Sequence, residues 1–165
     1  PNLKHRIILS LLYSSGLRIT ELQKLKISDV DFEARRMYIK CSKNGVSRYV
    51  VLSQLIAKGL KQYLTIYDPR LYLINGWLKG KPYSRSSVAK VLNRAIQRAG
   101  LSKHITIHSL RHSFAVHFLE QGGNILQLKD QLGHKRLQST LIYLRITSPR
   151  YKEVQSPLDV LYQIN

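Results

Sequence analysis

His108 and Arg111 are three residues apart in the segment His108-Ser-Leu-Arg111, so a helix over this segment would place both side chains on one face. An imidazole and a guanidinium on one face can together bind a phosphate group. For this tetrapeptide alone, a solvated helix face is an equally good interpretation. Residues of similar chemistry stand near the ends of predicted elements: Arg18 at a helix start, Lys43 at a hairpin tip, His134 after a helix end and Tyr143 nine residues later.

The periodicity of apolar residues predicts the elements that would position these side chains. Spacings of three and four predict helices over residues 3–14, 18–26, 53–66, 107–121, 125–132 and 139–146, and over 84–99 with Ser84 or Ser86 as the cap. Short β-type runs over residues 29–32, 36–41 and 47–52, with the turn signal Asn44-Gly45 between the last two, predict a small three-stranded antiparallel sheet. The predicted fold class is therefore α+β and mainly α-helical.

The charge balance indicates a nucleic-acid partner. The chain has 27 Lys and Arg against 9 Asp and Glu, a net charge of +18 that is spread along its length. A merely soluble basic surface, a ribosomal protein or a membrane-surface protein are the alternatives. Arg85 and one basic helix face are the predicted contacts to a DNA groove or backbone, with a solvated helix face as the alternative. That face consists of Lys90, Arg94 and Arg98.

Length and composition predict one domain over residues 1–165, because no linker rich in Pro, Gly or Ser divides the chain. No apolar run reaches about 18 residues and the charged N-terminal segment offers no signal-peptide core, so we expect neither membrane insertion nor secretion. The single cysteine, Cys41, has no cysteine partner, which is typical of a reducing, cytoplasmic location. The chain does not begin with Met, so an upstream domain stays an open question.

Five short blocks occur in the order and spacing of one known family. They are Ser14-Ser-Gly-Leu-Arg18, Cys41-Ser-Lys43-Asn-Gly45, His108-Ser-Leu-Arg111-His-Ser-Phe-Ala115, Leu132-Gly-His134 and Ser139-Thr-Leu-Ile-Tyr143. Each block alone is weak, but together they resemble the catalytic domain of the tyrosine recombinases, also called the phage integrase family. The similarity spans roughly residues 3–146 and implies the fold of that catalytic domain.

The resemblance implies a role for each matching residue. Arg18 and Arg111 would bind the scissile phosphate, Lys43 would be the general acid, His108 and His134 would assist, and Tyr143 would be the nucleophile. Elementary chemistry supports these roles, because a phenol with a pKa near 10 attacks poorly until the phosphate is neutralised and a base is near its proton. Two guanidiniums can neutralise it by bidentate hydrogen bonds, and a lysine can protonate the leaving 5′-oxygen.

The resemblance also implies the reaction and the assembly. A 3′-phosphotyrosyl bond would retain the phosphodiester energy, so strand cleavage and rejoining would need no ATP, metal or other cofactor. The expected partner is double-stranded DNA, with a homo-tetramer on paired sites and a monomer without DNA. An N-terminal DNA-clamping domain is expected to be absent from this chain, and the tail over residues 147–165 is expected to dock on a neighbouring protomer.

Several residues have rival interpretations. His104, His108 and His112 have the spacing of a zinc site but no acidic or thiol partner. Tyr151 is the rival nucleophile to Tyr143, and both Lys40 and Arg48 are close enough in sequence to rival Lys43. Glu21 is expected to orient Arg18 by a charge-assisted hydrogen bond, with a surface pair of spacing i, i+3 as the alternative.

Two other classes of function compete with a recombinase. A non-catalytic DNA-binding module would need only the charge and would keep its activity in Tyr143→Phe. A type IB topoisomerase would use similar tyrosine chemistry to reseal one duplex, and would not join different DNA molecules. The intact residue set disfavours the first, and the compact spacing between the blocks disfavours the second.

Overall fold

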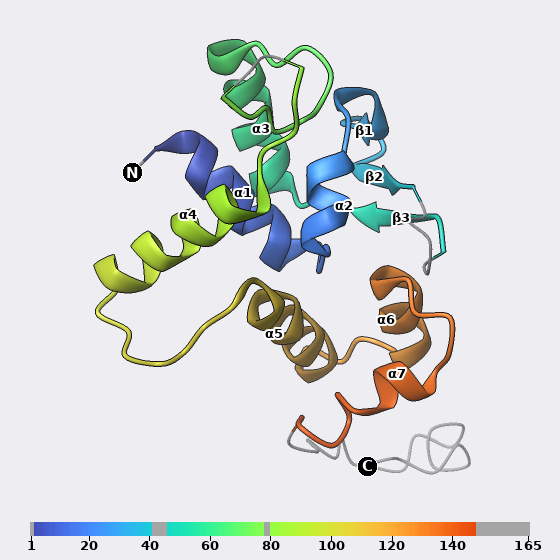
Figure 1. Cartoon of the computed structure of the whole chain (residues 1–165). Helices are drawn as coiled ribbons and strands as arrows, with labels where there is room; N and C mark the ends of the chain where they lie inside the picture. Colours follow the sequence, from blue (N-terminus) through green and yellow to red (C-terminus); the bar gives the residue numbers. More distant parts are fainter. Residues whose placement is uncertain (1, 41–45, 78–79, 148–165) are drawn as a thin grey trace, which may run out of the picture.

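The computed structural model describes residues 2–40, 46–77 and 80–147. The described elements are seven α-helices, one 3-10 turn and three short strands (Figure 1). In chain order they are α1 (Leu3–Ser14), α2 (Ile19–Lys24), η1 (Ile27–Asp29), β1 (Val30–Asp31), β2 (Arg36–Ile39), β3 (Arg48–Val51), α3 (Gln54–Tyr67), α4 (Arg85–Arg98), α5 (Ile107–Glu120), α6 (Ile125–Leu132) and α7 (Gln138–Leu141). The predicted α+β class, mainly helical, is confirmed.

Local sequence explains where most of the longer helices begin. The residue before the first turn carries a side-chain oxygen that accepts a hydrogen bond from a backbone N–H of that turn, which satisfies a donor that the helix itself leaves unpaired. These caps are Asn2 for α1, Ser53 for α3, Ser84 for α4, Thr106 for α5 and Asn124 for α6. The structure therefore selects Ser84, and not Ser86, as the cap of α4.

The sheet is antiparallel in the order β1-β2-β3. Met37 of β2 pairs with Val30 of β1 and with Val50 of β3. Burial alternates along β3, so that Arg48 and Val50 face inward while Tyr49 and Val51 face solvent. This alternation is the period of two that a strand with one covered face requires, and it places a charged side chain on the covered face.

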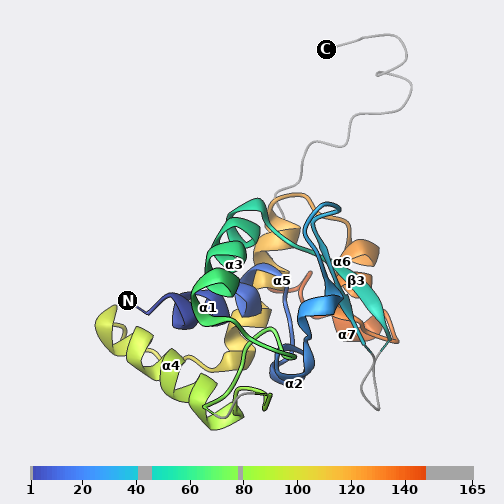
Figure 2. The same cartoon turned by 90° about the horizontal axis from the view of Figure 1, so that it is seen from above.

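The core has two parts. The larger part joins α1, α2, the sheet, α3 and the first turn of α4, with Leu11, Leu12, Leu60 and Leu73 fully buried in it. The smaller part lies among the C-terminal helices α5, α6 and α7 and contains Ala115, Leu128, Leu132 and Tyr143. Figure 1 shows these three helices together below α1 and α2, and Figure 2 shows α6 beside β3. Functional residues on α2, β3 and α5 can therefore meet between the two parts.

The predicted helix over residues 139–146 is wrong in length. α7 ends at Leu141, and the backbone continues in turns whose hydrogen bonds mostly join residues three apart, such as Tyr143 N–H to the carbonyl of Thr140. The apolar side chains that would have formed a helix face there are largely exposed, so no packing favours a longer helix. They are Leu141, Ile142, Leu144 and Ile146.

Candidate active site

Glu21 organises the N-terminal side of the site. Its side chain is only 5% exposed and its carboxylate accepts two hydrogen bonds from Arg18, one from the backbone N–H at 2.8 Å and one from Nη1 at 3.0 Å. Arg18 is the residue immediately before the first turn of α2, and its side chain is about one-third exposed. The alternative of a surface pair is wrong, because Glu21 is buried and fixes both the backbone and the side chain of Arg18.

Arg48 is the second partner of Glu21, a role that was not predicted from the sequence. Its Nη1 and Nη2 donate to the two carboxylate oxygens of Glu21 at 2.9 and 3.0 Å, and its Nε donates to the carbonyl of Gln131 at 2.7 Å. Burial acts to raise the pKa of the Glu21 carboxyl, but the hydrogen bonds and charges of Arg48 and Arg18 outweigh it and hold that pKa below its usual value. Glu21 is therefore ionised at neutral pH.

Arg111 reaches from α5 across to the N-terminal part of the chain. Nη1 donates to the carbonyl of Gly16 at 2.6 Å, and Nη2 donates to the carbonyl of Leu132 at 2.7 Å. Gly16 adopts a positive φ of 59° in the turn before Arg18, and an added Cβ would lie 2.5 Å from the Phe114 ring. Burial, followed by the charge of Arg18, lowers the pKa of Arg111 to about 10, so the guanidinium stays charged at neutral pH.

His134 is neutral and has a defined tautomer. Its Nε2 lies 3.2 Å from Nη2 of Arg111, and because a guanidinium only donates, Nε2 must be the acceptor. The ring proton is therefore on Nδ1, which donates to Oγ1 of the buried Thr140 at 2.9 Å. Burial, followed by the charge of Arg111, lowers the pKa of His134 to about 4. His134 thus connects Arg111 to Thr140 of α7, and Thr140 lies three residues before Tyr143.

Of these groups, Arg18 and Arg111 line one open pocket of about 240 Å³. Its polar lining comes from α2, α4 and α5, which are far apart in sequence. The lining residues are Leu17, Arg18, Ile19, Thr20, Arg85, Ile107, His108 and Arg111. The structure therefore brings His108, Arg111 and Arg18 together, and it places the predicted DNA contact Arg85 in the same pocket. Three arginines and a histidine around one opening make it a site for an anion such as a phosphodiester.

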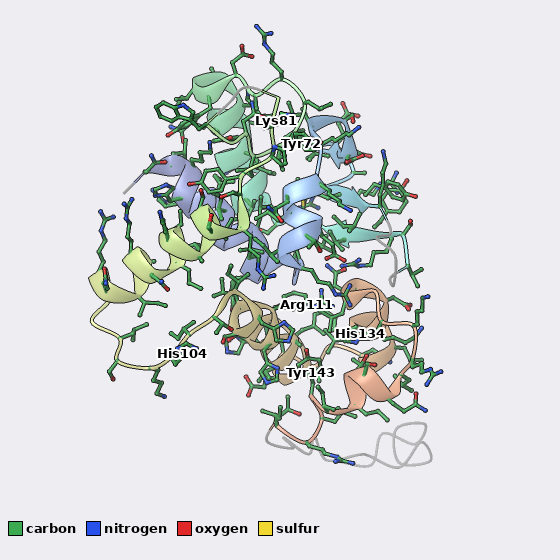
Figure 3. The ribbon with its side chains drawn as sticks, viewed as in Figure 1. Tyr72, Lys81, His104, Arg111, His134 and Tyr143 are labelled. Atoms are coloured by element: carbon green, nitrogen blue, oxygen red, sulfur yellow. The ribbon has the colours of Figure 1, made fainter. Side chains whose placement is uncertain are left out.

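Tyr143 lies next to this pocket but does not line it. Figure 3 shows Arg111, His134 and Tyr143 near one another, with His104 away from them on the loop before α5. The Tyr143 side chain packs in the smaller core, the residue is only 3% exposed, and its ring centroid is 5.0 Å from that of His112. Burial raises the pKa of the Tyr143 phenol, although the charges of Arg111 and Arg18 act in the opposite direction.

The remaining candidate residues from the sequence lie outside this pocket or outside the described residues. Lys43 and Tyr151, like the tail beyond residue 147, lie outside the described residues. Lys40 is exposed and pairs with Asp29 at 3.5 Å, whereas Arg48 is buried with three of its donors occupied, so neither has the exposed, unpaired position that a rival to Lys43 needs. Arg94 and Arg98 line a different groove, between α1 and α4, and Lys90 is exposed without lining either opening.

The described part of the chain contains neither a metal-ligand cluster nor a membrane-spanning helix. Within residues 2–40, 46–77 and 80–147, no group of three or more His, Cys, Asp or Glu side chains is arranged to hold a metal ion. The spacing of His104, His108 and His112 thus does not assemble a ligand cluster, because α5 begins only at Ile107. Over the same ranges, no helix has the length and apolar character needed to cross a bilayer.

Two functional contacts were missed from the sequence, and each had a partial signal. Arg48 alternates with Val50 and Leu52, so its strand pattern put it on the covered face, where a charge requires an acidic partner. Thr140 had no signal of its own, because its contact with His134 depends on how α6 and α7 meet.

Residues 2–150 match the model of the phage integrase family. The chain belongs to this family. The tyrosine recombinase XerA of Pyrococcus furiosus is 35% identical over 162 residues, which cover 96% of this chain and 56% of that protein. A crystal structure of XerA recombinase has a TM-score of 0.79 at 31% identity, over 86% of this chain and 53% of that one.

A second solved structure of the family contains DNA. The XerH site-specific recombinase bound to a palindromic difH substrate, in a post-cleavage complex, has a TM-score of 0.77 at 26% identity, over 98% of this chain and 46% of that one. The predicted catalytic-domain fold is therefore confirmed. The chain spans about half the length of the relatives that it matches.

Proposed function

We propose that this chain is the catalytic part of a site-specific DNA recombinase or integrase that cleaves and rejoins strands through a 3′-phosphotyrosyl intermediate. The observation that carries the proposal is the meeting of Arg18, Arg111 and His108 around one open pocket, with Tyr143 adjacent. A non-catalytic DNA-binding module would not require Glu21 to hold Arg18 at such an opening. The proposed domain covers residues 1–165, and the family match over residues 2–150 supports it.

The proposed chemistry is an in-line displacement at phosphorus. Arg18 and the free N–H groups of Arg111 bind the nonbridging oxygens and the charge that develops on them. The Tyr143 oxygen forms the new P–O bond, its proton passes to His108, and the bond to the 5′-oxygen breaks. Lys43 supplies the proton to that oxygen. Rejoining is the reverse, with a 5′-hydroxyl from another strand. These roles require neither a metal nor ATP.

Arg111 has few donors left for the phosphate. A guanidinium has five N–H groups, and three of those of Arg111 already point at Gly16, Leu132 and His134. At most two remain, one on Nε and one on Nη1, and they point to different sides of the guanidinium. Arg111 can therefore donate only separate single hydrogen bonds to the phosphate, and its position is fixed before DNA arrives. Arg18 is more exposed and supplies the adaptable contact.

Tyr143 must leave its packed position to react. The buried phenol is next to the pocket and not in it, so the turns after α7 have to move when DNA is bound. The segment is suited to this, because its other apolar residues are exposed and hold it weakly. Binding of a phosphate would offset the cost of exposing the ring by adding a partner for its hydroxyl.

Double-stranded DNA is the proposed partner, as homo-tetramers on paired sites with monomers in the absence of DNA. Arg85 contacts the backbone at the pocket, while Lys90, Arg94 and Arg98 extend the basic surface along α4. The exposed Leu141, Ile142, Leu144 and Ile146 form an apolar surface that a neighbouring protomer would cover, and the tail over residues 147–165 would dock on that neighbour. The proposed location is the cytoplasm, on DNA.

The deciding experiment is covalent trapping on nicked duplex DNA. A nick beside the scissile phosphate lets the short strand diffuse away, so an SDS-resistant protein–DNA adduct accumulates. We expect the adduct with the wild-type chain and with Tyr49→Phe, an exposed tyrosine on β3, and none with Tyr143→Phe. An adduct that survives in Tyr143→Phe would refute the assignment of the nucleophile.

Two further outcomes separate the alternatives. Salt-sensitive DNA binding without an adduct, in this chain and in a longer one with upstream sequence, would favour a DNA-binding module. An adduct with no joints between different DNA molecules would favour a topoisomerase.

A further inference from the structure

We infer that Arg48 is a positioning residue: by occupying Glu21 from the sheet side, it prevents Glu21 from drawing Arg111 out of the phosphate pocket. This inference rests on the proposed function for its effect on DNA cleavage, but its structural content concerns only this chain. Arg48 does not line the pocket, and its side chain is 7% exposed, so it acts through other residues and not by touching DNA.

The first observation is that the acceptor positions of Glu21 are full. A carboxylate has about four lone-pair positions, and Glu21 accepts two hydrogen bonds from Arg18 and two from Arg48, all between 2.8 and 3.0 Å. Arg111 comes next, with Nη1 at 3.8 Å from Oε2 of Glu21. That distance is beyond a hydrogen bond, so Arg111 is attracted by the charge but has no acceptor position to enter.

The second observation is that loss of the Arg48 side chain would remove two hydrogen bonds from the Glu21 carboxylate. Two acceptor positions on Glu21 would become vacant, and Arg111 would have to shift by only about 1 Å to reach hydrogen-bond distance. The shift would pull Nη2 away from Nε2 of His134 and turn the guanidinium away from the phosphate. A displacement of this size in a positioned catalytic group costs about 10²-fold in rate.

The third observation ties Arg48 to the turn that carries His134. Nε of Arg48 donates to the carbonyl of Gln131, and Gly133, at a φ of 65°, leaves the room that the guanidinium fills. A Cβ on Gly133 would lie 2.7 Å from Nη1 of Arg48. Arg48 therefore contacts both sides of the site, the carboxylate that holds Arg18 and the turn that leads to His134.

Among the charged residues that the structure describes, three cations face Glu21, each from a different part of the fold. Arg18 faces it from its own helix, Arg48 from β3 and Arg111 from α5, while the neutral His134 lies behind Arg111. The buried carboxylate thus has three cations around it and bonds to only two of them. Arg48 decides which two, because it is the one cation of this set that has no place in the pocket.

The test compares Arg48→Met and Arg48→Lys with the matched control Arg36→Met. Arg36 is an exposed arginine on β2, paired with Asp31 at 3.4 Å, so its loss removes the same charge from the same sheet. In Arg48→Met we expect the single-turnover rate of adduct formation at saturating DNA to fall about 10²-fold, while the Kd for DNA changes less than about threefold. Arg48→Lys should recover part of the rate, and Arg36→Met should keep all of it.

The double variant Glu21→Gln/Arg48→Met separates positioning from folding. Removing the carboxylate charge removes the attraction on Arg111, but it also weakens the hold on Arg18, so the double variant is compared by the position of Arg111 and not by rate. We expect the ¹⁵N resonance of His134 Nε2 in the double variant to return toward the wild-type value, whereas a resonance that stays as in Arg48→Met would count against positioning. All rates are measured well below each variant's unfolding temperature, and Arg48→Lys keeps the comparison available if Arg48→Met does not fold.

A readout without DNA makes the inference independent of the proposed activity. The ¹⁵N resonance of His134 Nε2 reports the hydrogen bond from Arg111, and it should move toward that of a free neutral imidazole in Arg48→Met, move less in Arg48→Lys, and stay in Arg36→Met. An unchanged Nε2 resonance in Arg48→Met and Arg48→Lys would overturn the inference. A shifted resonance, with no adduct from the wild type of either this chain or a longer one, would overturn the proposed function and leave the role of Arg48 standing.

Discussion

Replacing Thr140 with valine tests the tautomer and the charge state assigned to His134. Valine has nearly the shape of threonine, so the change removes the acceptor of the Nδ1–H hydrogen bond and leaves the packing of a fully buried residue intact. Thr140→Ser is the matched control, because it keeps the hydroxyl and loses a methyl group. The two variants therefore separate the hydrogen bond from the packing.

The expected loss of unfolding free energy follows from the Nδ1–H group of His134, which valine would leave without an acceptor. A buried N–H without a partner costs about 1–3 kcal/mol of unfolding free energy. His134 cannot avoid this cost by moving its proton to Nε2, because that atom would then face the N–H of Arg111 at 3.2 Å, donor against donor. For a domain of this size the expected fall in Tm is roughly 2–12 °C.

The assay is urea unfolding at pH 7 for the wild type and both variants, with ¹⁵N NMR of the imidazole of His134. We expect the wild type to show a neutral ring protonated at Nδ1. A wild-type ring protonated at Nε2 would refute the reasoning directly. The reasoning would also be refuted if the unfolding free energy of Thr140→Val lay within about 0.5 kcal/mol of the wild-type value, because substitutions at the protein surface have effects of that size.

Gly133, His134 and Arg85 each allow a separate test. Gly133→Ala should lower the unfolding free energy more than Gly100→Ala. Both glycines have a positive φ, so both substitutions carry the backbone cost of about 1–2 kcal/mol, but only a Cβ at Gly133 would contact Arg48. Equal losses of unfolding free energy in urea would contradict this prediction. Between pH 6.5 and 4 the unfolding free energy should fall as pH falls, because the folded pKa of His134 lies near 4, below its value in the unfolded chain; stability is full above pH 6.5, and His134→Gln should flatten this part of a pH series of denaturation curves. Affinity for duplex DNA should fall linearly with salt on logarithmic axes, and Arg85→Ala should reduce the slope by about 1 in a titration series; an unchanged slope would remove Arg85 from the DNA contact.

The helices that position the site follow from local sequence. The apolar spacing around Leu11 and Leu12 predicts α1, and Ser53, Ser84 and Thr106 mark helix starts because each side chain can accept a backbone hydrogen bond. The spacing of His108 and Arg111 likewise predicts that both reach one opening. Such inferences hold because a helix fixes the relation between residues three or four apart without reference to the rest of the fold.

Contacts between distant elements were not predictable in this way. Arg48 and Glu21 are 27 residues apart, and only the approach of β3 to α2 makes them partners. The turns after α7 were predicted as helix because the apolar pattern continues there, yet burial of Tyr143 and the hydrogen bond of Thr140 decide that backbone instead. In both places tertiary contact outweighs local preference.

The two parts of the core meet through two arginines that cross in opposite directions. Arg48 reaches from β3 to the carbonyl of Gln131 at the end of α6, and Arg111 reaches from α5 to the carbonyl of Gly16 before α2. Apolar packing is not directional, so it can hold the parts together without fixing their distance to a fraction of an ångström, whereas charge-assisted hydrogen bonds can. The Arg111 contact holds α5 against the turn before Arg18, and both lie at the pocket, whereas the Arg48 contact lies outside the pocket lining and holds β3 against the end of α6. A substitution at either arginine must be assayed for both unfolding and cleavage rate, because one contact governs the two quantities together.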